Sequence, residues 1–171
     1  DRIEWARIVP FILMHATCLC VLWVGWSPVA VLVAVLAYVV RMFAITGFYH
    51  RYFSHRTFKT SRVGQFVFGV IGATAVQRGP LWWAAHHRRH HRHADQEGDS
   101  HSPLNGRFWW SHVAWFTTRR NFRTDLAQLP DLRDRAELRW LDRFDVAAPL
   151  SLLAALYVLG EILAVQAPSL E

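Results

Sequence analysis

Long apolar runs without a single formal charge most constrain how this chain can fold. Residues 8–26 and 27–40 are uncharged, the second run continues past Arg41, and residues 146–167 are interrupted only by Glu161. A helix rises 1.5 Å per residue, so segments of about 20 residues cross a hydrocarbon core of about 30 Å. With 53% hydrophobic residues, the composition also exceeds the usual soluble balance. We therefore predict an all-α fold with three membrane spans, at about 8–26, 28–49 and 146–167.

The positive charge lies in one block and predicts the orientation of the spans. Of the 19 Lys and Arg residues, 17 lie between Arg41 and Arg143. The positive-inside rule places this block, about 50–145, in the cytoplasm. The N-terminus is then cytoplasmic, and Glu171, after three spans, lies on the opposite face. Because the basic residues share their segment with membrane spans, we expect lipid headgroups or an acidic partner as their targets and no nucleic acid.

Within the cytoplasmic block, apolar spacing and helix breakers divide the chain. Residues 63–76 are apolar but too few to span, so we expect a buried or interfacial helix. Gly79 and Pro80 begin a second helix that runs to about residue 93. Residues 107–120 have aromatics spaced for an amphipathic helix on the bilayer. Residues 121–143 alternate acids and arginines around Leu and Trp, which favours a solvated helical pair.

Histidines are concentrated at the start of this block, in two groups. His50 and His55 are five residues apart, and the second group is His87, His90 and His91. The spacings of three and four put the second group on one side of a helix. Neutral imidazole is a common ligand of iron, zinc, copper and nickel. Packing histidines are the alternative, and structural zinc is less favoured because no Cys lies near. Two such groups indicate a site for more than one ion.

An oxidisable metal at a membrane surface suits the oxidation of an unactivated C–H bond in an acyl chain, because no side chain supplies that oxidising power. The segments HRYFSHRTFKTSR and GPLWWAAHHRRHHRHADQEGDSHSPLNGRFWWSHVAW resemble the first and second histidine boxes of membrane fatty acyl desaturases, the delta-9 stearoyl-CoA type and its bacterial acyl-lipid relatives. The resemblance covers essentially the whole chain. It implies four membrane helices in the complete protein and a cytoplasmic helical cap that carries the histidine boxes.

The same resemblance implies a reaction and its cofactors. It implies two Fe ions, O2 as co-substrate, and insertion of a cis double bond, delta-9 by analogy, into a saturated acyl chain on CoA or lipid. The resemblance also implies that electrons come from a b-type cytochrome or a ferredoxin. The metal ligands carried over are His50, His55, His87, His90 and His91.

Four further residues match binding positions of the family. Gln77 and Trp83 match positions that shape the acyl tunnel, although a helix-end amide and an interfacial aromatic are the plainer interpretations. Arg119 and Arg120 fall where relatives carry basic residues for the acyl carrier, although paired arginines beside a membrane often bind lipid headgroups.

The arginines between the ligands must point elsewhere. We expect Arg88, Arg89 and Arg92 to face solvent or carboxylates such as Asp95 and Asp99. Those two acids are also candidates for orienting imidazoles.

The chain departs from the family pattern in one respect. The family has a further span and a third histidine cluster, whereas no histidine follows His112 here. We expect residues 1–171 to be the N-terminal part of one desaturase domain, inactive by itself. The alternatives are a membrane fatty acid hydroxylase of the same superfamily and a non-catalytic metal-binding partner subunit. A metal transporter is disfavoured, because the spans offer only His15, Glu161 and Arg41 along an ion path.

Overall fold

The computed structural model describes residues 2–25, 27–96, 99–100 and 102–166. Within these ranges the chain is helical, apart from loops and an isolated antiparallel bridge between Ile3 and Thr118. The predicted all-α class is therefore confirmed. Trp26, His101, Ala167 and Glu171, on which predicted span ends, a neighbouring histidine and the predicted topology depend, lie outside the described residues.

Within the described residues, two helices are long and apolar enough to cross a membrane. Helix α3 (Pro28–Phe43) begins at the N-cap Ser27, whose hydroxyl accepts from the Ala30 amide at 3.2 Å, and continues through the π-helix η2 (Ala44–Ser54). Helix α9 spans Ala147–Gln166. Only 11% of the apolar window of the first helix and none of that of the second is buried, so neither is the core helix of a soluble protein. These exposed apolar surfaces suit lipid.

The first predicted span forms a shorter apolar rod. It consists of α1 (Trp5–Thr17), the 3₁₀ turn η1 (Cys18–Cys20) and α2 (Val21–Val24). Its apolar helical part, Ile8–Val24, is shorter than the two long helices. The span at residues 8–26 therefore stays a prediction.

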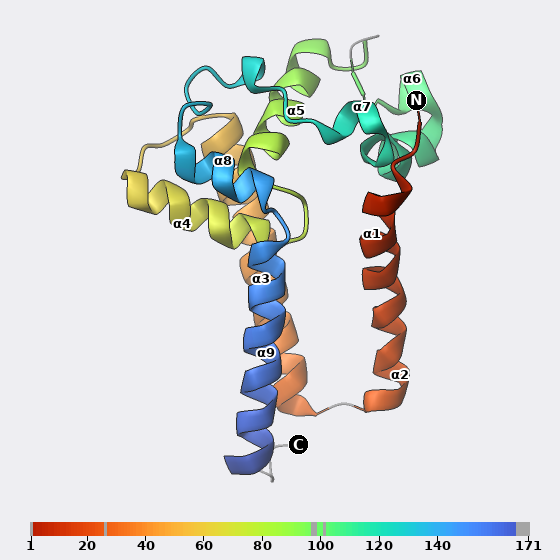
Figure 1. Cartoon of the computed structure of the whole chain (residues 1–171), viewed down its shortest axis with the longest axis vertical. Coiled ribbons are helices and arrows are strands. Elements are labelled where there is room, and N and C mark those ends of the chain that lie inside the picture. Colours follow the sequence, from red (N-terminus) through yellow and green to blue (C-terminus); the bar gives the residue numbers. More distant parts are fainter. Residues whose placement is uncertain (1, 26, 97–98, 101, 167–171) are drawn as a thin grey trace.

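The remaining helices gather at one end of the long rods (Figure 1). They are α4 (Arg62–Ala73), α5 (Pro80–His93), α6 (Pro103–Trp109), α7 (Arg119–Phe122) and α8 (Ala136–Arg143). Helix α5 matches the predicted bounds, with Gly79 as N-cap and Pro80 at its first position. The helix predicted over 107–120 is interrupted: α6 runs into a short π segment (Trp110–Ala114) and a 3₁₀ turn (Trp115–Thr117), and the chain becomes extended at Thr118.

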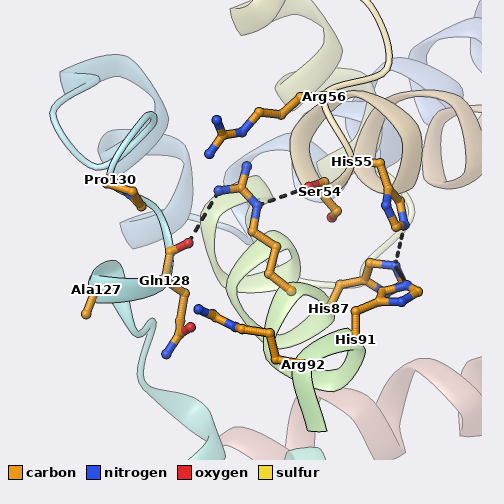
Figure 2. A pocket seen from close by; sticks show the side chains of 10 residues that line it. Ser54, His55, Arg56, His87, His91, Arg92, Ala127, Gln128 and Pro130 are labelled. Atoms are coloured by element: carbon orange, nitrogen blue, oxygen red, sulfur yellow. Dashed lines mark hydrogen bonds between the residues drawn. The ribbon is translucent and has the colours of Figure 1, made fainter. Parts of the chain in front are cut away.

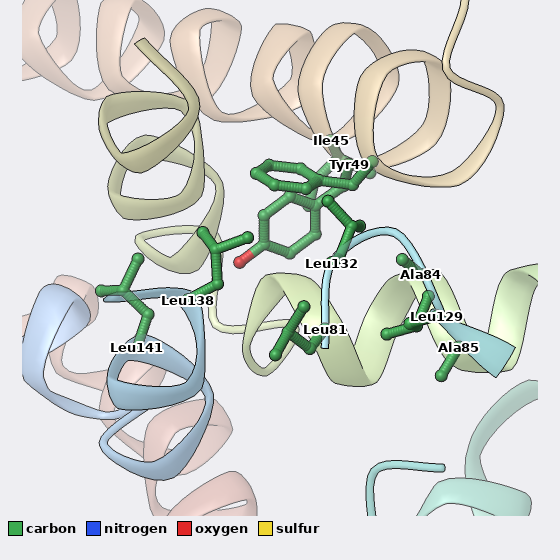
Figure 3. Close-up of a cluster of buried hydrophobic side chains, with 10 residues drawn as sticks. Ile45, Tyr49, Leu81, Ala84, Ala85, Leu129, Leu132, Leu138 and Leu141 are labelled. Atoms are coloured by element: carbon green, nitrogen blue, oxygen red, sulfur yellow. The ribbon is translucent and has the colours of Figure 1, made fainter. Parts of the chain in front are cut away.

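Leucines from residues 121–143, the segment rich in acids and arginines, complete the core. The prediction that this segment forms a solvated helical pair is therefore wrong. Within the described residues, α7 ends at Phe122, and residues 123–143 form a 3₁₀ turn (Leu126–Gln128) and one α-helix, α8. Leu129 and Leu138 are fully buried, because they pack against η2 and α5 (Figure 3). Arg133 and Arg135 lie between these two leucines in the sequence and are exposed. The cluster comprises Ile45, Tyr49, Phe53, Leu81, Ala84, Ala85, Leu129, Leu132, Leu138 and Leu141.

Tyr49 anchors η2 in this core. Its ring is fully buried and its hydroxyl donates to the carbonyl of Arg78 at 3.0 Å. A Cβ placed on Gly72 of α4 would lie 2.1 Å from this ring, so a glycine is required for the approach. The residue after Tyr49 is His50, and the anchor therefore fixes the start of the first histidine group.

Candidate metal centre

The π-helical form of η2 decides where His50 and His55 point. In an α-helix, residues five apart lie about 140° apart around the axis, because each residue turns about 100°. Here the amide of His55 donates to the carbonyl of His50 at 3.1 Å, the five-residue bond of a π-helix. The two imidazoles consequently meet, with 3.1 Å between their Nε2 atoms. Local π-helix often marks a functional site.

Helix α5 supplies the other half of the cluster. His87 and His91 are one turn apart, and their Nε2 atoms are 3.0 Å apart. The Nε2 atom of His87 also lies 3.1 Å from that of His55 (Figure 2). One nitrogen from each of the four histidines His50, His55, His87 and His91 lies within 4.8 Å of the other three. Two elements far apart in the sequence thus present four imidazoles to one point.

This donor set fits a transition-metal ion. Metal–nitrogen bonds of about 2.0–2.1 Å place ligand atoms at roughly right angles about 3 Å apart. The separations between neighbouring Nε2 atoms are 3.0–3.1 Å, and all four donors are imidazoles. His50 and His87 are half-buried while His55 and His91 are exposed, so the cluster is open on one side. Four-nitrogen sets of this kind suit iron, copper, zinc or nickel.

The environment also favours the neutral, ligating form of these imidazoles. Burial, followed by the neighbouring histidines, lowers the pKa of His87 from 6.5 to about 3. Burial and then His50 lower the pKa of His55. A metal ion would therefore displace few protons from these two side chains at neutral pH.

His90, the fifth predicted ligand, lies outside the group of four. Its Nδ1 is 2.9 Å from an oxygen of Asp99, whose side chain is fully buried. That carboxylate also accepts from the amide of Asp95 at 3.1 Å. The expected orienting role agrees with this contact for Asp99, because a carboxylate on one ring nitrogen fixes the tautomer and the ring plane. The Asp95 carboxylate instead accepts from the hydroxyl of Ser102 at 2.7 Å.

The two predicted tunnel residues lie together beside the cluster. The indole Nε1 of Trp83 donates to the side-chain oxygen of Gln77 at 3.1 Å. The indole also stacks on His87, with 4.8 Å between ring centroids and an interplanar angle of 25°. Trp83 therefore covers one side of the histidine cluster, and the hydrogen bond from its indole to Gln77 fixes the orientation of the ring.

Arg88 and Asp131 form a contact that sequence reasoning missed. Arg88 was expected to face solvent or a carboxylate such as Asp95 or Asp99, but it forms a bidentate pair with Asp131, at 2.7 and 3.1 Å. Burial acts to raise the pKa of Asp131, but hydrogen bonds and charge from Arg88, and the charge of Arg56, lower it overall. No local pattern signals this pair, because its members are 43 residues apart.

Asp142 of α8 holds the other end of α5. Its carboxylate accepts from the amide of Trp82 at 2.7 Å, in the first turn of α5, and from the hydroxyl of Thr124. The amide is one of the helix-terminal donors that have no partner inside the helix. Burial raises the pKa of Asp142. This cap was also missed, because it comes from residues far along the chain.

A pocket of about 420 Å³ opens beside the cluster (Figure 2). Its lining includes His55, His87 and His91 on one side and Gln128 and Pro130 on the other.

The predicted carrier-binding arginines lie elsewhere, at the start of α7. Arg119 is 3.4 Å from Glu4 and its amide donates to the carbonyl of Arg2. Arg119 and Arg120 are both exposed and neither lines this pocket. The structure therefore does not bring them to the histidine cluster.

Together, the fold and the site define a helical membrane protein with a cluster of four imidazoles at the end of a long apolar helix. The sequence comparisons give the family. A profile of the fatty acid desaturase family matches residues 7–169, and the chain belongs to that family.

Curated relatives are desaturases with different products. The sn-2 palmitoyl-lipid 9-desaturase of Nostoc sp. (strain 36) is 34% identical over 93% of this chain and 57% of its own length. The chloroplastic palmitoyl-monogalactosyldiacylglycerol delta-7 desaturase of Arabidopsis thaliana is 36% identical over 77% and 36%. The icosanoyl-CoA 5-desaturase of Limnanthes douglasii is 30% identical over 89% and 44%. No solved structure matches the chain.

These alignments cover a larger share of this chain than of the relatives. The chain is matched almost throughout, but it spans only about half the length of the curated relatives. Membership of the family is therefore shown for this segment of a desaturase-like chain.

Proposed function

We propose that this chain forms the part of a fatty acyl desaturase that binds iron through its first two histidine boxes. The observation that carries the proposal is the convergence of His50, His55, His87 and His91 to within 4.8 Å. Bound iron would supply, with O2, the oxidising power needed to remove hydrogen from an unactivated C–H bond, which no side chain provides. The proposed product is a cis double bond in an acyl chain on CoA or lipid.

The surrounding residues support this role through their own chemistry. Trp83 and Gln77 give the site an apolar wall with a fixed orientation, which suits an acyl chain laid beside the metal. His90, oriented by Asp99, is proposed as a ligand of a second iron, because a carboxylate on Nδ1 makes Nε2 the basic nitrogen. The remaining ligands of a two-iron site would come from outside this segment.

We further propose a position for the double bond and a class of electron donor. Delta-9 agrees with the Nostoc relative, whereas other relatives are named delta-7 and 5-desaturases. A b-type cytochrome or a ferredoxin is the proposed donor. We place residues 50–145 on the cytoplasmic side and the rod Trp5–Val24 in the membrane as a third span, in keeping with the charge distribution.

The test is made in a complete desaturase that carries this segment. His87→Ala should abolish formation of the unsaturated fatty acid while the protein stays in the membrane fraction. His93→Ala is the matched control, because His93 is an exposed histidine on the same helix outside the group of four. Product analysis by mass spectrometry under ¹⁸O2 separates the alternatives: labelled oxygen in the fatty acid indicates a hydroxylase. Unchanged product from His87→Ala would refute the metal assignment.

A further inference from the structure

Every N–H group of the Arg88 guanidinium donates a hydrogen bond to another group of the protein. Arg88 makes five hydrogen bonds, one for each guanidinium N–H, and only 13% of its side chain is exposed. Two go to the carboxylate of Asp131 and one to the carbonyl of Gln128, at 3.3 Å. The other two go to the carbonyls of Phe53 and Ser54, at 2.6 and 3.1 Å. A saturated, nearly buried arginine is a structural connector rather than a solvated charge.

The two carbonyls belong to the end of η2, directly before His55. Carbonyls in the last turn of a helix have no partner inside the helix, and a cation there is also favourable for the helix dipole. Arg88 is itself the residue after His87. Its side chain thus joins the backbone that carries His55 to the helix that carries His87, while the two imidazoles meet at 3.1 Å on the other side.

Asp131 holds this connector in place. Its carboxylate accepts two hydrogen bonds from Arg88, at 2.7 and 3.1 Å. It also forms an ion pair at 2.8 Å with Arg56, which is the residue after His55. One carboxylate therefore contacts the arginines that follow each of the two histidines. We propose that Arg88 and Asp131 are positioning residues of the metal centre, which set the distance between the two histidine-bearing elements. This inference rests on the proposed metal-binding function.

The experiment uses the 171-residue chain in detergent with two readouts. The first is the affinity for Co²⁺, followed by its visible absorption. The second is metal-independent: nitroxide labels on Arg51→Cys of η2 and His93→Cys of α5, in a background of Cys18→Ser and Cys20→Ser, give the distance distribution between the elements by EPR. The variants are Arg88→Gln, Arg88→Lys and Asp131→Ala.

Glu137→Ala is the matched control. Glu137 also forms a forked ion pair, with Arg62 at 2.7 and 2.8 Å, but this pair joins α4 to α8 away from the cluster. We expect Arg88→Gln and Asp131→Ala to broaden the distance distribution and to weaken Co²⁺ binding by about 10- to 100-fold, the usual cost of losing a group that orients metal ligands. Arg88→Lys should be intermediate, because an ammonium group cannot form the fork. Glu137→Ala should match the parent chain.

The outcomes separate the two proposals. If the parent chain binds no Co²⁺, the proposed metal function fails, and the label distances still decide the positioning role. If Arg88→Gln and Asp131→Ala keep the parental distance distribution, or if Glu137→Ala broadens it equally, the positioning role is overturned. Circular dichroism establishes that each variant is folded, and Arg88→Lys decides if Arg88→Gln does not fold.

Discussion

The amide of His55 donates to the carbonyl of His50 across five residues, and this one bond turns a spacing of five into a pair of converging ligands. The same spacing in an α-helix would separate the imidazoles by about 140° around the axis. The imidazoles of His50 and His55 therefore meet because η2 is a π-helix. Two contacts hold η2 against other elements: its own Tyr49 packs against Gly72 and donates to the carbonyl of Arg78, and Arg88 of α5 donates to the carbonyls of Phe53 and Ser54.

Gly72→Ala is expected to destabilise the protein through Tyr49. The new methyl group would lie 2.1 Å from the Tyr49 ring, which has no room to move within the core. Overpacking of this kind costs about 1–3 kcal/mol, so the thermal midpoint should fall by several degrees. Gly160→Ala in α9 is the control, because nothing lies within 4 Å of its added methyl group. Equal midpoints for the two variants would contradict the packing described for η2.

Asp142→Asn should be much milder than Asp142→Ala. Burial disfavours the charged carboxylate, so a neutral amide loses little, and its oxygen still accepts from the Trp82 amide. The Thr124 hydroxyl can turn to accept from the new amide group. Alanine leaves the helix donor without its cap, at a cost of about 1–2 kcal/mol. Unfolding monitored by circular dichroism at pH 7 compares the two, and an asparagine variant as unstable as the alanine variant would show that the charge itself is required.

The metal-free chain should lose stability as the pH falls from about 6.5 toward 3. The pKa of His87 is about 3 in the folded protein and 6.5 without burial, so in this window the unfolded chain binds a proton that the folded chain does not. Stability from this group is complete above pH 6.5 and decreases on acidification. Thermal midpoints between pH 7 and 4 measure the slope, which His87→Gln should reduce. Parallel slopes in the parent and the variant would exclude His87 as the source.

The double variant Arg119→Gln with Arg120→Gln tests the carrier-binding role that the family resemblance predicts for these two arginines. In a complete desaturase, loss of one charge-assisted contact of ~1.4 kcal/mol would raise KM for acyl-CoA about tenfold, with kcat retained. Co²⁺ binding by the chain should not change, because both arginines are exposed and lie outside the pocket beside the histidines. An unchanged KM would leave Arg119 as a partner of Glu4 and Arg120 as a surface charge.

Local signals in the sequence predicted much of the fold, and four of the five histidines predicted as metal ligands lie together in the structure. The helix Pro80–His93 was predicted at its observed bounds, because Gly79 and Pro80 define its start by backbone chemistry alone. The three-and-four spacing places His87 and His91 correctly for one turn of an α-helix. His90 shares that helix, yet its ring turns to Asp99, which spacing does not reveal.

The features that sequence did not predict depend on contacts between distant residues. A π-helix has no distinct amino-acid composition, so the sequence did not predict that the imidazoles of His50 and His55 would come together. Leu129 and Leu138 were predicted to belong to a solvated segment because their sequence neighbours are charged, but both are fully buried. Asp131 and Asp142 reach α5 from 43 and 60 residues along the chain, a distance that no periodicity encodes.

The contacts of α5 with residues later in the chain also set an order in time. During synthesis His91 leaves the ribosome before Asp131 and Asp142, so all four imidazoles are available before either of the carboxylates that hold α5, the helix of His87 and His91. A nascent chain ending shortly after α5 therefore has a complete set of four nitrogen donors without their final arrangement. The four donors reach that arrangement only after residue 142 has emerged, when Asp131 and Asp142 can both hold α5.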